Sequence, residues 1–211
     1  MSGGTRGIGR ATVEALVKVK AQVTATCTGK GKLDALKAEI PSMEIIYIDM
    51  SKWKETEKAF SKLPPQDCLM NNAEPAGKVT EDRFDKVFAV NVKAMINVTQ
   101  LVTRKMVEVG IKGSVVNISS YMSQKIYPRS IAYRSSKAAV DHITRGFAKP
   151  LALHGTRVNT VHPNIVVTNM GNFFADLVRE TEPESPIPLT ATSSPRKWPN
   201  RLSSSSAISP P

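Results

Sequence analysis

The chain has 211 residues, a hydrophobic fraction of 41%, a charged fraction of 22% and a formal net charge of +11 at pH 7. This length gives room for one α/β domain with a sizeable core and an appendage. No run approaches the roughly 18 consecutive apolar residues of a membrane span, so no membrane-spanning helix is expected. The basic residues are spread singly rather than clustered, which disfavours nucleic-acid binding as the main role.

Cysteine and histidine usage indicates no metal site. The two cysteines are far apart, and no pair among the cysteines and histidines has the spacing of metal ligands. We interpret all five as structural residues: Cys27, Cys68, His142, His154 and His162. The first residues also lack the apolar core of a secretory signal peptide, which predicts a reducing, cytoplasmic compartment.

The predicted elements alternate along the chain. A glycine-rich stretch at residues 3–9 precedes a helical pattern at 10–19. Strand-like runs then alternate with amphipathic runs, which is typical of βα units around a parallel sheet. Strands are expected at 22–27, 44–48, 67–71, 113–119 and 156–161, and helices at 32–40, 54–63, 80–109 and 131–153. Pro150 falls in the last helix, where an interior proline costs about 3 kcal/mol unless the helix ends or kinks there.

The alternation stops near Gly171. Residues 181–211 contain seven of the fourteen prolines and eight serines. Such a segment buries too little apolar surface to offset its ordering entropy. We therefore expect residues 1–171 to form the folded domain and residues 172–211 to be a disordered Ser/Pro-rich tail.

The glycine-rich stretch has two interpretations when taken alone. Glycines at 3, 7 and 9, followed by a helix, would let backbone N–H groups and a helix N-terminus approach a pyrophosphate. The spacing differs from G-x-G-x-x-G, and a glycine-rich end is often only flexible, so both interpretations stay open at this point.

A tyrosine and a lysine form the second candidate site. Tyr133 and Lys137 are four residues apart in a predicted helix and so share one face. An ammonium beside a phenol favours the phenolate and lowers its pKa from about 10 toward the range of a general acid or base. Ser120 follows a predicted strand thirteen residues before Tyr133, and Asn91 lies in the long predicted helix.

Together these segments resemble the short-chain dehydrogenase/reductase family over residues 2–171. "SGGTRGIG" is similar to its cofactor loop, "NNA" at 71–73 to its strand-four motif, and "NISS" with "YRSSK" to its active site. "HPNIVVT" at 162–168 is similar to the segment that closes over the nicotinamide. Within the family, the chain most resembles the dicarbonyl and L-xylulose reductases. The resemblance implies a Rossmann-like doubly wound parallel sheet that lacks the first strand and the final helix and strand.

The resemblance also implies NADPH-dependent reduction of a small carbonyl substrate, a dicarbonyl or a ketose. Tyr133 would donate the proton, and Lys137 would lower the pKa of the phenol and bind the nicotinamide ribose. Ser120 would polarise the carbonyl, and Asn91 would hold a water that relays protons. A homotetramer is implied as well. The implied cofactor contacts are Gly3, Arg6, Gly7, Ile8, Gly9, Asp49, Asn71, Tyr133, Lys137, Val166 and Thr168.

The residues after the first predicted strand bear on the choice of cofactor. "CTGKGK" at 27–32 offers no acidic residue for a free ribose 2′-hydroxyl, which argues against NAD. Arg6, with Lys30 or Lys32, could meet a 2′-phosphate instead. Asp49 would contact the adenine by resemblance, or would cap a helix.

Only Met1 and Ser2 precede the first glycine, where the family has a central strand. Its absence would leave two interior strand edges with unpaired backbone groups, each costing about 1 to 3 kcal/mol if buried. It would also tether the glycine loop at its helix end alone. The alternative function is therefore a catalytically impaired or non-enzymatic relative.

Overall fold

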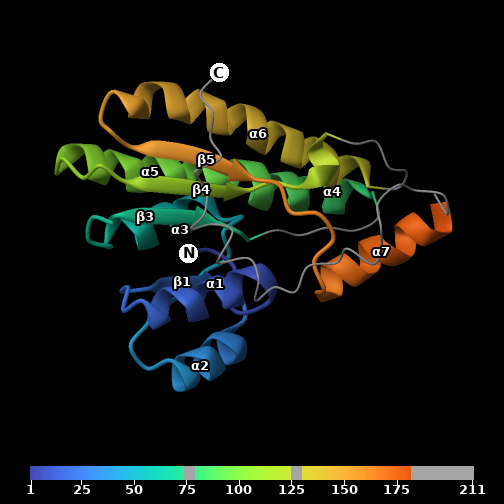
Figure 1. Cartoon of the computed structure of the whole chain (residues 1–211), viewed down its shortest axis with the longest axis horizontal. Coiled ribbons are helices and arrows are strands. Elements are labelled where there is room, and N and C mark those ends of the chain that lie inside the picture. The colour runs from blue at the N-terminus through green and yellow to red at the C-terminus, as the bar shows by residue number, and fades with distance from the viewer. Residues whose placement is uncertain (74–78, 125–129, 182–211) are drawn as a thin grey trace.

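The computed structural model of the protein describes residues 1–73, 79–124 and 130–181. Strands and helices alternate as the apolar pattern predicts, within a few residues at each boundary (Figure 1). The strands are β1 (Thr24–Cys27), β2 (Glu44–Tyr47), β3 (Cys68–Asn71), β4 (Ser114–Ile118) and β5 (Arg157–Val161). The α-helices are α1 (Gly7–Lys18), α2 (Lys30–Glu39), α3 (Trp53–Ser61), α4 (Glu81–Phe88), α5 (Met95–Glu108), α6 (Ile131–Ala152) and α7 (Asn169–Thr181).

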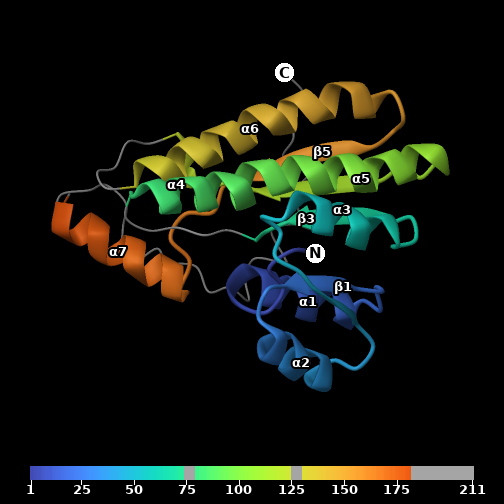
Figure 2. The ribbon, with the colours of Figure 1, turned by 180° about the vertical axis from the view of Figure 1, so that it is seen from behind.

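All strand pairs are parallel, and helices cover both faces of the strands. β1 pairs with β2, and β4 lies between β3 and β5. Helix α5, with α3 beside it, lies behind the strands in Figure 1 and in front of them in Figure 2, whereas α1 lies on the opposite face. This arrangement confirms the predicted doubly wound α/β fold.

The first three residues stand where a central strand would lie. The Ser2 N–H donates to the Met70 carbonyl at 3.1 Å, and the Gly3 N–H donates to the Thr26 carbonyl at 3.0 Å. In return, the Thr26 N–H donates to the Met1 carbonyl at 3.0 Å. A short stub, Met1–Gly3, therefore bridges β1 and β3. The expectation that the glycine loop is tethered only at its helix end is wrong, because these bonds fix its other end.

The apolar faces of the helices form separate clusters against the strands. On one side Val98, Leu101 and Met106 of α5 pack with Val115 of β4. A second cluster joins α1, β1 and α2 and includes Val13, Val23, Ala25, Leu33, Leu36 and Met43. Full burial of one such side chain contributes about 1.5 to 3 kcal/mol, so each cluster stabilises its part of the fold.

The long helix expected at 80–109 is continuous but changes its winding. A π-helical segment, η1 (Ala89–Ala94), joins α4 to α5. The Thr80 side chain caps the first turn of α4 by accepting from the Arg83 N–H. Wider π turns inside α-helices are often found at functional sites, and here the segment contains Asn91.

Pro150 lies in the last turn of α6, which ends at Ala152. At the end of the helix, the Leu153 N–H donates a hydrogen bond to the Pro150 carbonyl at 3.3 Å, three residues back instead of four. Pro150 has no N–H to donate to the Gly146 carbonyl, and the helix ends two residues later, so few helical hydrogen bonds follow the proline.

The folded part of the chain extends beyond Gly171, where the sequence predicts that a tail begins. Helix α7 runs through that boundary to Thr181, and Phe174 and Ala175 are buried. Assigning residues 172–181 to a disordered tail is therefore wrong. Residues 182–211 lie outside the described part of the chain. Among the described helices, none combines the length and the apolar character needed to cross a membrane.

Candidate active site

The glycine loop is shaped by positions that admit no side chain. Gly3 and Gly7 have φ angles of +66° and +56°, in the left-handed region that glycine adopts without strain. A Cβ on Gly9 would stand 2.1 Å from the Gly3 carbonyl oxygen and 2.6 Å from the Asn72 amide nitrogen. Helix α1 starts at Gly7 directly after this turn, so its first N–H groups face the loop and suit an anion.

A serine and an asparagine hold the loop against β3. Ser2 Oγ accepts hydrogen bonds from the backbone N–H groups of Asn72 at 2.9 Å and Ala73 at 3.0 Å. The Asn72 side-chain amide donates to the carbonyls of Ser2 and Gly3 at 3.2 and 3.1 Å. Sequence reasoning did not identify Ser2 or Asn72 as site residues, because their partners are about 70 residues away.

Two of the predicted catalytic side chains line one cavity. Ser120 follows β4, and Tyr133 projects from the first turn of α6; both are buried. They share a cavity of about 70 Å³ with residues 163–166, which follow β5. The cavity thus lies at the carboxyl ends of β4 and β5, where open α/β sheets bind ligands.

Lys137 lies one helical turn beyond Tyr133. Its Nζ donates to the Ile118 carbonyl at the end of β4 at 2.7 Å and stands 5.4 Å from the centre of the Tyr133 ring. The side chain is only 2% exposed. The structure therefore brings Ser120, Tyr133 and Lys137 to one end of the sheet.

Asn91 lies beside a second, smaller cavity. The Asn91 side-chain amide donates to Ser136 Oγ at 3.0 Å, whereas its Oδ1 atom is buried without a hydrogen-bond partner among the described residues. The cavity measures about 10 Å³ and is also lined by Lys137 and Asn71. This is close to the least volume that holds one water, and the polar lining supplies partners for it.

Asn71 is part of a buried network that joins four elements. Its amide donates to Thr99 Oγ1 at 3.1 Å and to Asn117 Oδ1 at 2.8 Å. The Asn117 amide in turn donates to Thr144 Oγ1 at 2.9 Å. The network links β3, α5, β4 and α6, so the Asn71 side chain has a structural role in addition to its position beside the small cavity.

The segment after β5 lines the cavity and packs against the start of α1, next to the glycine loop. Val166 is buried and packs in one cluster with Ile8 of α1. Thr168 Oγ1 accepts from the Gly171 N–H at 3.0 Å, as the N-cap of α7 would. A Cβ on Gly7 would lie 3.2 Å from the Thr168 methyl group. The predicted contacts Gly7, Ile8, Val166 and Thr168 therefore meet at one place.

The side chains expected near an adenosine are exposed. Arg6 precedes α1 without capping it, and Lys30 lies 6.0 Å from the Tyr47 ring centre. Lys32 is exposed as well. Asp49 does not cap a helix, because the residue before α3 is Lys52; that alternative is wrong.

The Asp49 carboxylate instead accepts the Ser51 N–H and hydroxyl at 3.0 and 2.8 Å. Burial acts to raise the pKa of Asp49. The bonds from Ser51, with the nearby charges of Lys52 and Lys86, outweigh burial and hold that pKa below its usual value. Asp49 is thus an exposed anion at the end of β2.

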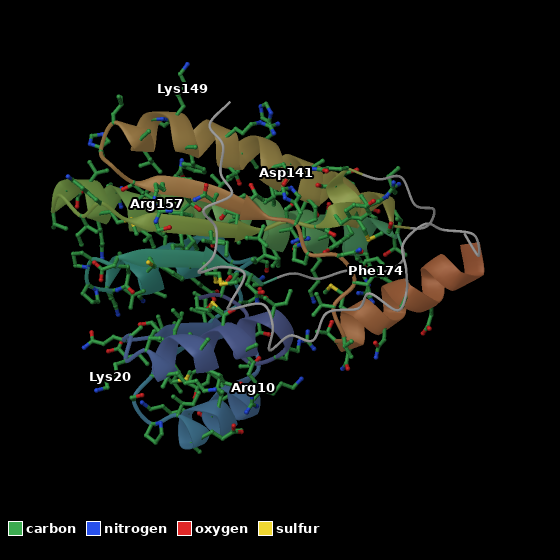
Figure 3. All side chains as sticks on the ribbon, in the orientation of Figure 1. Arg10, Lys20, Asp141, Lys149, Arg157 and Phe174 are labelled. Atoms are coloured by element: carbon green, nitrogen blue, oxygen red, sulfur yellow. The ribbon has the colours of Figure 1, made fainter. Side chains whose placement is uncertain are left out.

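Phe174 covers the Tyr133 ring. The two ring centres lie 5.1 Å apart with an interplanar angle of 37°, and both residues are buried. Phe174 is labelled in Figure 3. Met122 and Met170 pack against the pair. Sequence reasoning missed Phe174, because the composition of its segment indicated a tail.

Comparison with known proteins agrees with this geometry. The family model described as short chain dehydrogenase matches residues 1–176. The chain belongs to the short-chain dehydrogenase family. Family members bind NAD(P), and the predicted oxidoreductase class and Rossmann fold are confirmed.

Two curated members of the family illustrate the similarity. The L-xylulose reductase of Homo sapiens is 39% identical over 176 residues, an alignment that covers 81% of this chain and 72% of that protein. The carbonyl reductase (NADPH) 2 of Sus scrofa is 40% identical with the same coverage. The predicted resemblance to L-xylulose and carbonyl reductases is therefore confirmed.

One solved structure of the short-chain dehydrogenase family shows the same fold with a cofactor. It is a candidate NAD(P)-dependent gluconate 5-dehydrogenase from Beutenbergia cavernae with bound NADP, with a TM-score of 0.84 and 26% identity. The match covers 95% of this chain and 85% of that one.

Proposed function

We propose that this short-chain dehydrogenase reduces a small carbonyl compound with NADPH. The observation that carries the proposal is the shared cavity of Ser120 and Tyr133, with Lys137 buried beside the Tyr133 ring. A hydroxyl pair with an adjacent ammonium can bind and protonate a carbonyl oxygen. The names of the similar proteins, L-xylulose reductase and carbonyl reductase, support a small polar carbonyl substrate.

The residues of the glycine loop fit a dinucleotide. Gly9 cannot carry a Cβ, because the loop closes on itself there, and the start of α1 offers N–H groups to a pyrophosphate. NADPH would be held by Gly3, Gly7 and Gly9 on one side and by Val166 and Thr168 on the other. The bound cofactor supplies the hydride.

Ser120 would orient the substrate. Its Oγ accepts the Met122 N–H at 3.1 Å, which fixes the hydroxyl at the start of the short turn η2 (Tyr121–Ser123). A hydroxyl has one hydrogen to donate, and a bond to the substrate oxygen would place that hydrogen where negative charge develops. The serine would thus polarise the carbonyl that Tyr133 protonates.

Tyr133 would donate the proton to the carbonyl oxygen, and Lys137 would favour the phenolate left behind. Reprotonation of Tyr133 would pass by way of Lys137 and a water beside Asn91. Support for this route comes from the partnerless Asn91 Oδ1 and the small cavity that it shares with Lys137.

A preference for NADPH follows from charge. The residues directly after β1 are Thr28, Gly29 and Lys30, so no carboxylate stands there to bind a ribose 2′-hydroxyl. Exposed Arg6 and Lys30 suit a 2′-phosphate.

The test is oxidation of NADPH by the purified chain with diacetyl and with L-xylulose. We expect turnover with at least one of them, and a lower rate with NADH. The competing function, a catalytically impaired or non-enzymatic relative, is favoured by the short strand-like pairing between β1 and β3, which among the described residues involves Met1–Gly3 alone. Tight NADPH binding without turnover of either carbonyl would support that alternative and contradict the proposal.

A further inference from the structure

One carboxylate joins the two walls of the substrate cavity. Asp141 lies on α6, two turns beyond Tyr133, and is labelled in Figure 3. Its Oδ2 accepts the Ser123 hydroxyl at 2.6 Å, and its Oδ1 bonds His162 Nε2 at 2.9 Å. Ser123 ends the turn that Ser120 begins, and His162 directly follows β5.

The two partners of Asp141 belong to two segments that both line the cavity. One segment contributes Ser120, Tyr121 and Met122, and the other contributes residues 163–166. The segments also touch directly, because the Tyr121 N–H donates to the Pro163 carbonyl at 2.9 Å. Asp141 therefore holds both segments against α6, the helix that carries Tyr133.

We propose that Asp141, with Ser123 and His162, is a positioning residue that sets the separation of the cavity walls and thereby the affinity for the carbonyl substrate. This inference rests on the proposed function. Asp141 is not among the described residues that line the cavity, so its effect on the substrate would pass through α6 and the two segments that it joins.

The environment of Asp141 favours a fixed carboxylate over a solvated one. Its side chain is 15% exposed, and that of His162 is 31% exposed. Burial acts to raise the pKa of Asp141, but hydrogen bonds from His162, Ser119 and Ser123 outweigh it and hold the pKa below its usual value. Hydrogen bonds to an ionised acceptor are about twice as strong as neutral ones, which suits a joint between two loops.

Kinetics of three single variants test the proposal: Asp141→Asn, Ser123→Ala and His162→Gln. The matched control is His142→Gln, because His142 is exposed on α6 next to Asp141 and its ring bonds Arg145 on the same helix. We expect Asp141→Asn to raise KM for diacetyl about tenfold and the other two variants about threefold. The dissociation constant for NADPH should stay within about twofold, and the control should match the unsubstituted chain.

Amide hydrogen exchange gives a second readout that needs no activity. In Asp141→Asn, the Tyr121 amide should exchange at least about tenfold faster, since its bond to Pro163 lies between the joined segments. The Arg157 amide, bonded to Gly113 at the opposite end of β4 and β5, should keep its rate.

The outcomes separate this inference from the proposed function. If the unsubstituted chain turns over no carbonyl, the proposed function fails, and Tyr121 exchange alone decides whether Asp141 joins the walls. Unchanged Tyr121 exchange in all three variants would overturn the inference. So would a uniform rise in exchange at Tyr121 and Arg157, because that result indicates a purely structural role. If Asp141→Asn does not fold, Ser123→Ala and His162→Gln decide between the same outcomes.

Discussion

Gly9 lies so close to Gly3 that a Cβ on Gly9 would stand 2.1 Å from the Gly3 carbonyl oxygen. Real Cβ atoms do not approach a backbone oxygen so closely, and neither backbone segment can yield without breaking the loop. The contact explains why the loop needs a glycine at this position of α1, although φ of Gly9 lies outside the left-handed region.

Gly9→Ala should therefore abolish NADPH binding. The added methyl group would push Gly9 away from Gly3 and Asn72 and disrupt the glycine loop that binds the pyrophosphate in the proposed function. The matched control is Gly31→Ala, which lies in α2 with no atom within 4 Å of the added Cβ. We expect the control to bind NADPH normally and to gain up to about 1 kcal/mol in unfolding free energy from its better helix propensity. Fluorescence titration gives the dissociation constant for NADPH of both variants. Comparable values would contradict the proposed role of the glycine loop in NADPH binding.

The stub Met1–Gly3 suggests an addition that strengthens the fold. Between β1 and β3, only these three residues supply strand-like hydrogen bonds among the described residues. About six apolar residues placed before Ser2 would extend the stub along both neighbours. We expect the extended chain to melt at higher temperature and to bind NADPH at least about tenfold more tightly, because the loop is then ordered before binding. Equal, tight binding by both chains would show that the stub suffices.

The amine of Met1 predicts a pH dependence of stability. Burial lowers the pKa of this amine from 8.0 to about 6. Between these values the unfolded chain binds more protons than the folded one, so the unfolding free energy should rise with pH, by about 2 kcal/mol in all. Urea unfolding at pH 6 and pH 8 measures the change. A chain acetylated at Met1 should lack this part of the pH dependence of the unfolding free energy. The same pH dependence in both chains would show that the amine is exposed to solvent in the folded state.

Local pattern was sufficient for most of the fold. Alternating apolar runs located all five strands, and helical periodicity located α1 to α6, because these elements bury one face along their own length. The π-helical turns at Asn91 were not predictable, since the winding of a helix leaves the apolar pattern almost unchanged.

The misses concern contacts between distant segments. Helix α7 was assigned to the tail because proline and serine dominate the residues after it. Its first turns are stabilised by the contact of Phe174 with Tyr133, 41 residues earlier in the chain. The hydrogen bonds between Ser2 and Asn72 likewise join residues that are 70 positions apart. No local signal in the sequence marks such pairs.

The most direct test of the proposed chemistry is the turnover of Tyr133→Phe with NADPH and the carbonyl that the unsubstituted chain reduces. Removing the hydroxyl removes the proposed acid but keeps the ring against Phe174 and Lys137. Tyr121→Phe is the matched control, because Tyr121 lines the same cavity. We expect Tyr133→Phe to lose about 10²- to 10⁴-fold in kcat with NADPH binding nearly unchanged, and the control to stay within about threefold. Retention of more than about a tenth of the turnover by Tyr133→Phe would contradict the central claim that Tyr133 is the general acid.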